Sequence, residues 1–397
     1  MTVATEVENN TTVVGEKENK EVKDMKTALN EEMPADNKQQ GDDTKETTEK
    51  IENEKKDDNT TTGGGDESSN KSATVHKTNY EKDVVYLYQY SRTPVIPSIS
   101  ASCLKVETWL RLNEIKYENV DHKMKFRSKK GQLPFIEIDG SEIADSTIII
   151  RELSQKFRKE LDANLTSEQR TISHAMISMI ENHLVWVVAW WRAKNTDSVL
   201  KGYQVNLQHA LGTRIPNGIL NIFFKFTYGR KGAKKVKAQG MGIHTAEEVA
   251  QFGCDDLKAL SDLLADKPFF FGDEPTTLDV VAFSHLAQIL YIEKSTPYAL
   301  RDYMQDNCPN LVGHCSRMKE RCFPDWEEIC SSLDMNTHLP KPPKEENKES
   351  KEDKKETKES KEGKDGDKEK ADGEEKEGEK DKEVDENKEK EERVEEK

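Results

Sequence analysis

The sequence predicts an ordered core in which a small α+β unit precedes a larger all-helical unit, with disordered segments at both ends. Strand-like and helix-like patterns alternate from about residue 83 to 160. The strand pattern then disappears, and helical periodicity continues from 166 to 335. The two ends of the 397-residue chain contain few aromatic or branched apolar residues. Such segments cannot bury enough apolar surface to offset the entropy lost on folding.

The ends also carry nearly all of the formal net charge of −16. Residues 1–82 contain 20 acidic and 12 basic residues, and 341–397 contain 25 and 18, which leaves 32 and 31 between them. We therefore predict a disordered acidic N-terminal region, 1–82, and a disordered Lys/Glu-rich tail, 338–397. Nucleic-acid binding is not expected, because neither the core nor the ends are net basic.

The cysteines and the N-terminus indicate a cytoplasmic protein. The six cysteines, all between 103 and 330, follow neither a CxxC nor a zinc-binding spacing, and MTVATEVENN is not a signal peptide. The longest apolar run, LVWVVAWWRA, is too short to span a bilayer. The nine histidines show no ligand spacing, so no metal site is expected.

Each part of the α+β unit has a local signal. The β-branched and aromatic run VVYLYQY is typical of a strand, and Asp139-Gly140 between two short apolar runs predicts a hairpin. The expected elements are a strand at 84–90, a helix from about 102, a strand at 117–120, a loop or short helix at 122–131, strands on both sides of 139–140, and a helix from about 146.

The second unit reads as helical throughout. We expect a long apolar helix over 167–193 and further helices near 199–212, 245–266, 276–292, 300–307 and 311–323. A segment at about 215–242 combines aromatic and basic residues, and we interpret it as an insertion between two helices. Trp186, Trp190 and Trp191 have helical spacing, which favours core packing; the alternatives are a homodimer contact or a membrane-facing surface.

Three motifs carry a resemblance to a known family. They are PSISASCLKVETWLR at 97–111, GQLPFIEIDGSEIADS at 131–146 and FFFGDEPTTLDVVAFSHLA at 269–287. Together with the order of elements, they resemble the glutathione S-transferase (GST) architecture, in which a thioredoxin-like domain (here 83–160) precedes an all-α C-terminal domain (here 166–335). Within it the core resembles the metaxin-like branch, and most closely the failed axon connections family.

The resemblance assigns a ligand-binding role to the second motif. It implies a cis peptide between Leu133 and Pro134, which turns the backbone of Leu133 toward a bound peptide. It also implies that Asp145 and Ser146, at a helix N-terminus, hold the γ-glutamyl end of glutathione. Simple helix capping explains the same residue types, because aspartate and serine are both preferred there.

The first and third motifs suggest different roles. By resemblance, Ser100 or Ser102 could activate a thiol at the start of the first helix, whereas Cys103 reads as a packed thiol. In the third motif, Thr276 and Asp279 form a capping box, which is a structural signal rather than a catalytic one.

The 215–242 segment is the candidate interaction surface. Its basic and aromatic residues could dock on anionic lipid or on an acidic groove of a partner. The alternative is a helix whose apolar face is buried and whose lysines are solvated. The residues predicted for this surface are Phe223, Phe224, Arg230, Lys231, Lys234 and Lys235.

Two functions compete on these grounds. The first is a non-catalytic GST-fold adaptor that binds protein partners in axonal signalling; its role in axon development is implied only by the resemblance. The second is an active glutathione-dependent transferase, for which glutathione would be the ligand. We expect the adaptor, in the cytoplasm or at the membrane periphery of axons, because long polar ends suit multivalent binding better than catalysis.

Overall fold

The computed structural model describes residues 75–340. Most of the two predicted disordered regions, 1–82 and 338–397, therefore lies outside the described residues. Within 75–82, His76 and Lys77 donate their backbone N–H groups to the buried carboxylate of Glu137, at 2.7 and 2.8 Å. The ordered core thus includes residues that the sequence assigned to the N-terminal region, because a buried acid needs hydrogen-bond donors and this segment supplies two of them.

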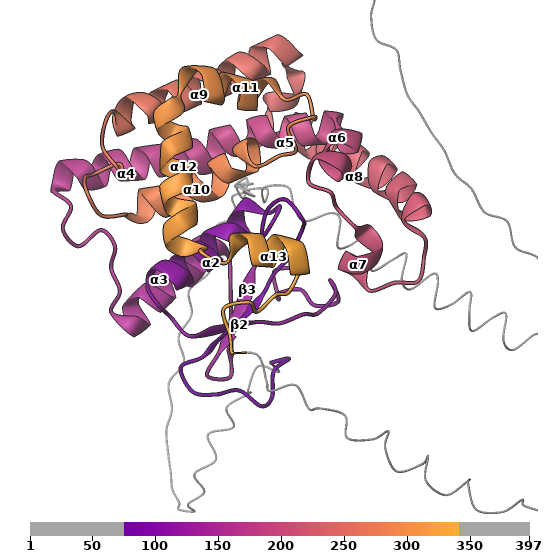
Figure 1. The fold of residues 1–397 in the computed structure, drawn as a ribbon, viewed down its shortest axis with the longest axis vertical. Coiled ribbons are helices and arrows are strands. Elements are labelled where there is room, and N and C mark those ends of the chain that lie inside the picture. Colours follow the sequence, from indigo (N-terminus) through magenta and orange to yellow (C-terminus); the bar gives the residue numbers. More distant parts are fainter. Residues whose placement is uncertain (1–74, 341–397) are drawn as a thin grey trace, which may run out of the picture. The chain divides into compact units, whose positions relative to one another are not determined.

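The α+β unit, drawn mainly in indigo and purple in Figure 1, contains a four-stranded mixed sheet, whose strand order is β2-β1-β3-β4. β1 pairs in parallel with β2 and antiparallel with β3, and β3 forms a hairpin with β4. The hairpin turns at Asp139 and Gly140, whose φ angles of 48° and 78° suit a tight two-residue turn. The strands are β1 (Val85–Tyr88), β2 (Tyr117–Asn119), β3 (Phe135–Ile138) and β4 (Ser141–Ala144).

Two helices cover one face of the sheet. α2 (Ala101–Leu112) connects β1 to β2, and α3 (Ser146–Phe157) follows β4. Val85 and Leu87 on β1 belong to the same buried cluster as Leu104 on α2 and Ile149 on α3. The observed order of strands and helices is the predicted one.

The opposite face of the sheet is covered mainly by aromatic side chains and loop residues. Tyr88 and Phe135 stack with ring centroids 4.3 Å apart, and His76 stacks on Phe126 at 4.2 Å. Residues 120–134, where a loop or short helix was expected, contain no helix. This loop and the segment at 75–83 together shield the aromatic rings from solvent.

The helical unit is organised around α10 (Thr277–Leu290). Every residue from Leu278 to Leu290 is buried, because α10 packs against α2 of the α+β unit and against α4 and α12. The other elements are α4 (Ser167–Met179), η1 (Ile180–Leu184), α5 (Val185–Lys194), α6 (Thr196–Gly202), α7 (Leu207–Leu211), α8 (Asn217–Gln239), η2 (Met241–Ile243), α9 (Ala246–Leu264), α11 (Ala299–Asn307), α12 (Pro309–Cys322) and α13 (Trp326–Ser332).

Three details differ from the sequence prediction. The expected helix over 167–193 contains one π-helical turn, η1, between α4 and α5. The expected helix over 199–212 is divided into α6 and α7 by Gln204, whose φ of 50° ends the first helix. Helix α13 was not predicted. None of the helices within 75–340 is long and apolar enough to cross a membrane.

Most of the 215–242 segment, predicted as an insertion between two helices, forms one helix, α8. α8 packs along α5, and its residues at intervals of four, from Leu220 to Val236, are buried. Phe224 belongs to this stripe, is 2% exposed and stacks on Tyr228. The prediction that Phe224 contacts a partner is therefore corrected: helical phase turns this ring into the core.

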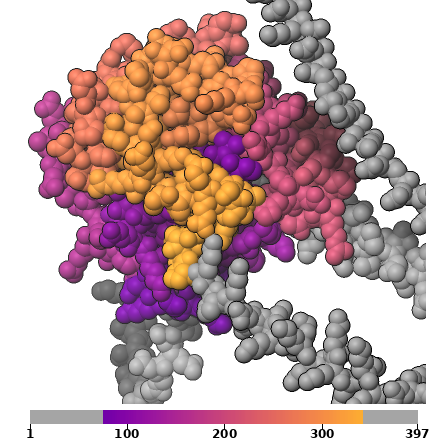
Figure 2. Space-filling view, viewed as in Figure 1, coloured from indigo at the N-terminus to yellow at the C-terminus, as the bar shows by residue number. Residues whose placement is uncertain are grey.

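The last described residues, 333–340, form a C-terminal strap that lies against the α+β unit (Figure 2). Asn336 accepts a hydrogen bond from the backbone N–H of Asn119 (2.7 Å) and donates one to its carbonyl (2.9 Å). His338 stacks on Tyr117, with ring centroids 4.1 Å apart. The strap thus satisfies backbone groups of β2 that an edge strand would otherwise leave unpaired.

Candidate functional site

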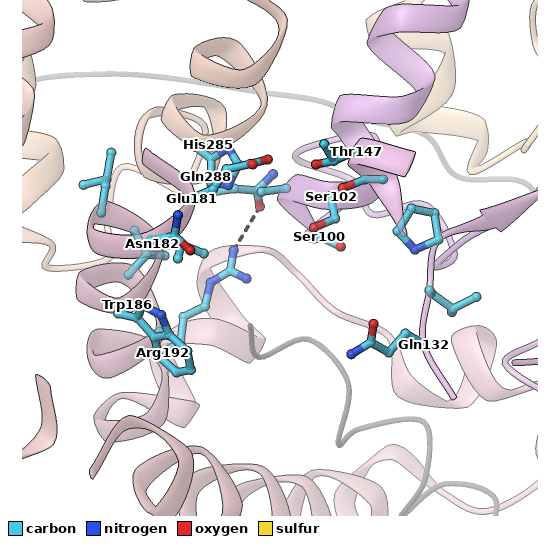
Figure 3. Close-up of a pocket in the computed structure, with 18 of the residues that line it drawn as sticks. Ser100, Ser102, Gln132, Thr147, Glu181, Asn182, Trp186, Arg192, His285 and Gln288 are labelled. Atoms are coloured by element: carbon cyan, nitrogen blue, oxygen red, sulfur yellow. Dashed lines mark hydrogen bonds between the residues drawn. The ribbon is translucent and has the colours of Figure 1, made fainter. Parts of the chain in front are cut away.

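A cleft of about 260 Å³ lies between the α+β unit and the helical unit. Figure 3 shows side chains from the two units facing each other across it. All six of the residues that the sequence singled out for catalysis or ligand binding line this cleft: Ser100, Ser102, Leu133, Pro134, Asp145 and Ser146.

Ser100 and Ser102 occupy the N-terminus of α2 but differ in their contacts. Ser100 is the N-cap, and its Oγ accepts a hydrogen bond from the backbone N–H of Cys103 at 3.4 Å. The hydroxyl of Ser102 has no hydrogen-bond partner within residues 75–340, so a ligand can reach it. Cys103 is fully buried, as expected for a packed thiol.

The second motif brings a strand entrance and a helix start to the same wall. The Leu133–Pro134 peptide is cis, as expected. Asp145 caps α3, because its Oδ1 accepts hydrogen bonds from the backbone N–H groups of Thr147 (3.0 Å) and Ile148 (3.2 Å). The φ of Asp145 is 85°, a conformation that non-glycine residues rarely adopt and that concentrates at ligand sites. Asp145 therefore caps α3, and this capping does not exclude a role for Asp145 in ligand binding.

The opposite wall holds the loop that precedes α2. Arg192 on α5 donates hydrogen bonds to the carbonyl of Ile99 (2.9 Å) and to Oε1 of Gln288 (2.9 Å). Gln288 on α10 donates to the carbonyl of Ser98 (3.1 Å). These contacts position the N-terminus of α2, and with it Ser100.

The π-turn η1 adds a carboxylate to the cleft. A π-turn shifts the helical register, and such turns are frequent at functional sites. Glu181 and Asn182 on η1 line the cleft. Oε1 of Glu181 lies 2.5 Å from Nζ of Lys105, whose side chain is only 2% exposed, and Nζ also donates to Oγ1 of Thr147 at 3.0 Å. The ion pair joins α2 to the helical unit at the edge of the cleft.

A buried histidine completes the helical wall. His285 on α10 lines the cleft and is 6% exposed. Burial lowers the pKa of His285 below its ordinary value of 6.5, and this outweighs the opposite effect of Glu181. The ring is therefore neutral at pH 7. Within residues 75–340 there is no group of histidine, cysteine, aspartate or glutamate residues that could hold a metal ion.

Thr276 and Asp279 lie outside the cleft and have more partners than a capping box requires. Oδ2 of Asp279 accepts hydrogen bonds from the N–H and the hydroxyl of Thr276 (2.8 and 2.7 Å). Its Oδ1 accepts from the N–H of Phe270 (3.0 Å) and contacts Nε2 of His314 (2.9 Å). Asp279 thus fixes the start of α10 to a preceding turn and to α12.

A second candidate site is the outer face of α8. Ile219, Ile222 and Phe226 are 49%, 68% and 61% exposed. The guanidinium of Arg230 lies 4.9 Å from the centroid of the Phe226 ring. We call this surface the α8 face; its predicted basic members Arg230, Lys231 and Lys234 are exposed, whereas Phe223 and Lys235 are half-buried.

Several residues in or beside the cleft could not be found from the sequence. Lys105 and Glu181 are 76 residues apart, and Arg192 and Gln288 are 96 apart. Neither pair follows a spacing motif, since their proximity arises only when α2, η1, α5 and α10 pack together. The one hint is Lys105 within the otherwise apolar stretch CLKVETWL, where an unpaired charge would be costly.

Comparisons with known proteins agree with this geometry. A family model described as "Glutathione S-transferase N-terminal domain" matches residues 101–198, and one described as "Glutathione S-transferase, C-terminal domain" matches 253–318. The fold and the cleft thus define a GST-like protein, with a thioredoxin-like domain followed by an all-helical domain.

Among the relatives, the Drosophila melanogaster protein "Failed axon connections" is 67% identical over 280 residues, which cover 69% of this chain and 67% of that protein. The chain therefore belongs to the failed axon connections family. "Isoprene-epoxide--glutathione S-transferase" of Rhodococcus sp. (strain AD45) is 29% identical over 255 residues, covering 60% of this chain and 99% of that protein. "Metaxin-2" of Mus musculus is 25% identical over 242 residues, covering 60% and 89%.

Proposed function

We propose that this protein is a non-catalytic adaptor of the GST fold that acts in axon development through its α8 face. The role in axons is carried over from the name of the Drosophila relative. The observation that carries the adaptor function is the placement of exposed apolar side chains. Of the five large apolar side chains that are exposed within 75–340, three belong to α8 and a fourth, Ile243, lies in the turn after it. Such clustering marks interaction sites.

The charge of α8 limits what the partner can be. From Asn217 to Gln239 the sequence contains six basic residues and no acidic one. A second copy of the same face would be repelled, because like charges would meet. A partner surface that is acidic and has an apolar recess fits better. An anionic lipid surface offers related chemistry and would place the protein at the membrane periphery, in the cytoplasm of the axon.

The test is rescue of axon growth in neurons that lack the endogenous protein. We expect Ile222→Ser combined with Phe226→Ser to abolish rescue, and Lys231→Glu combined with Lys234→Glu to weaken it. Tyr80→Ser and Lys258→Glu are matched controls, since they change an exposed apolar and an exposed basic residue elsewhere. Full rescue by the α8 variants contradicts the proposal.

Binding to phosphatidylserine vesicles, compared with phosphatidylcholine vesicles, distinguishes lipid from protein partners.

A second candidate, an active glutathione transferase, is favoured by one observation: six predicted site residues share a single cleft. Calorimetric titration with glutathione tests it. Binding at millimolar concentration or tighter that is lost in Ser146→Ala, together with turnover of an electrophile, supports the transferase. Rescue of axon growth by Ser100→Ala, Ser102→Ala and Ser146→Ala favours the adaptor.

A further inference from the structure

His285 has a fixed tautomer. Its Nδ1 lies 2.9 Å from the carbonyl oxygen of Val281 and 3.2 Å from Oγ of Ser284. A carbonyl oxygen can only accept a hydrogen bond, so Nδ1 carries the proton and Nε2 of the neutral ring has a lone pair. Nε2 has no hydrogen-bond partner within residues 75–340, although the side chain is more than nine-tenths buried.

Burial, helped by two cationic neighbours, keeps the ring neutral and Nε2 an acceptor. Glu181 on η1 raises the pKa of His285, whereas Lys105 on α2 and Arg192 on α5 lower it, and burial, which also lowers it, is the largest influence. Nε2 is therefore unprotonated at neutral pH. Nε2 is not among the fully buried side-chain atoms that lack a partner within 75–340, so this acceptor is open to a ligand in the cleft.

The facing wall offers the complementary group. In Figure 3, His285, Gln288 and Glu181 gather on one side of the cleft, and Ser100, Ser102 and Thr147 on the other. The hydroxyl of Ser102 can donate a hydrogen bond, and Nε2 of His285 can only accept one. A thiol suits both walls, because its sulfur accepts a hydrogen bond while its S–H donates one.

We propose that Nε2 of His285 accepts a hydrogen bond from the free thiol of a glutathione-like peptide bound in the cleft, so that the helical wall selects a free thiol over a blocked one. This inference rests on the second candidate function, in which the cleft binds glutathione. The competing interpretation is a structural histidine that only joins its ring to the preceding turn of α10, and this interpretation predicts no preference between thiols.

Calorimetry on the full chain compares glutathione with S-methylglutathione. We expect the wild type to bind glutathione about five-fold more tightly, the equivalent of one hydrogen bond. His285→Phe should bind both peptides equally, because it keeps a ring but removes the acceptor. His174→Phe, on the exposed surface of α4, is the matched control and should retain the preference.

Three results overturn the inference. They are equal affinities in the wild type, a preference that persists in His285→Phe and is therefore steric, and no binding of either peptide. The last result also removes the transferase but leaves the α8 adaptor intact. If His285→Phe does not fold, nitrogen NMR of the wild-type ring provides the test. We expect a neutral Nδ1–H tautomer whose Nε2 signal moves on addition of glutathione and not of S-methylglutathione.

Discussion

Arg92 and Glu107 form a bidentate ion pair in which both side chains are completely buried and both nitrogen–oxygen distances are 2.6 Å. Arg92 lies in the loop after β1 and Glu107 on α2. The guanidinium also donates to the carbonyl of Met335 in the C-terminal strap, at 2.9 Å. The pair therefore joins the sheet, the first helix and the end of the ordered chain.

Removing one member of this ion pair should lower the free energy of unfolding. Arg92→Met leaves the carboxylate of Glu107 buried without its main counter-charge, and we expect the free energy of unfolding to fall by about 3–5 kcal/mol. Urea unfolding measures the change. The double variant Arg92→Met with Glu107→Leu should recover part of this loss, because it removes the unpaired carboxylate while Arg111 keeps its ion pair with Asp325. A loss of less than about 1 kcal/mol in the single variant would mean that other donors replace Arg92.

The same network should make stability depend on pH. Burial raises the pKa of Glu107, but the charge and hydrogen bonds of Arg92 outweigh it and hold this pKa well below 4.5. For Asp325, burial is likewise outweighed, by Arg111, and its pKa is lowered. A carboxyl whose pKa is lower in the folded state contributes stability above its unfolded pKa and loses it as the pH falls through its folded pKa. We expect the free energy of unfolding, measured in urea, to decrease steadily below about pH 4.5.

Asp325→Asn provides the control for that titration. It removes one of the two lowered carboxyls, so the slope of stability against pH below about pH 4 should become shallower. An unchanged slope would assign the acid sensitivity to other groups.

Asp279 should matter more than an ordinary capping residue. Asp279→Ala removes a buried acceptor shared by Thr276, Phe270 and His314, and we expect a loss of about 3 kcal/mol in the free energy of unfolding. Glu248 is the matched control, because it completes the capping box of α9 at an exposed position. Glu248→Ala should cost about 1 kcal/mol. If the two variants lose equal stability in thermal or urea unfolding, Asp279 acts only as a capping residue.

The strap should stabilise the sheet through Asn336. Asn336→Ala loses two hydrogen bonds to the backbone of Asn119, which we expect to lower the free energy of unfolding by about 2 kcal/mol. Asn307, whose amide makes one exposed hydrogen bond within α11, is the control and should change stability by less than about 0.5 kcal/mol when replaced by alanine.

A chain that ends at 340 should be as stable as the full chain, whereas one that ends at 332 should lose stability and self-associate through β2.

Much of the fold followed from local signals. The Asp139-Gly140 hairpin and the helix starts at Ser100, Asp145 and Thr276 were predictable, because turn and capping chemistry acts between neighbours in the chain. The π-turn at η1, the division at Gln204 and the phase of α8 were not. Phe223, Phe224 and Phe226 lie within four residues of one another in the sequence. Only packing against α5 decides that Phe224 is buried and Phe226 is exposed.

The residues of the candidate site were likewise predictable only in part. One wall, from Ser100 to Ser146, comes from two contiguous motifs, so a resemblance could name its residues. The other wall is assembled from η1, α5, α8 and α10, and nothing local in the sequence marks Glu181, Arg192 or His285 as neighbours.

By itself, the sequence determined most of the helices and strands, several of the points where they begin, and that polar ends flank an apolar core, because these properties depend on contacts within a few residues. The tertiary structure alone decided which charges meet in the interior, which face of α8 remains in solvent and which side chains from distant helices line the cleft. Those outcomes depend on the packing of segments that can be more than 200 residues apart in the sequence, as with Asn119 and Asn336, which are separated by 217 positions.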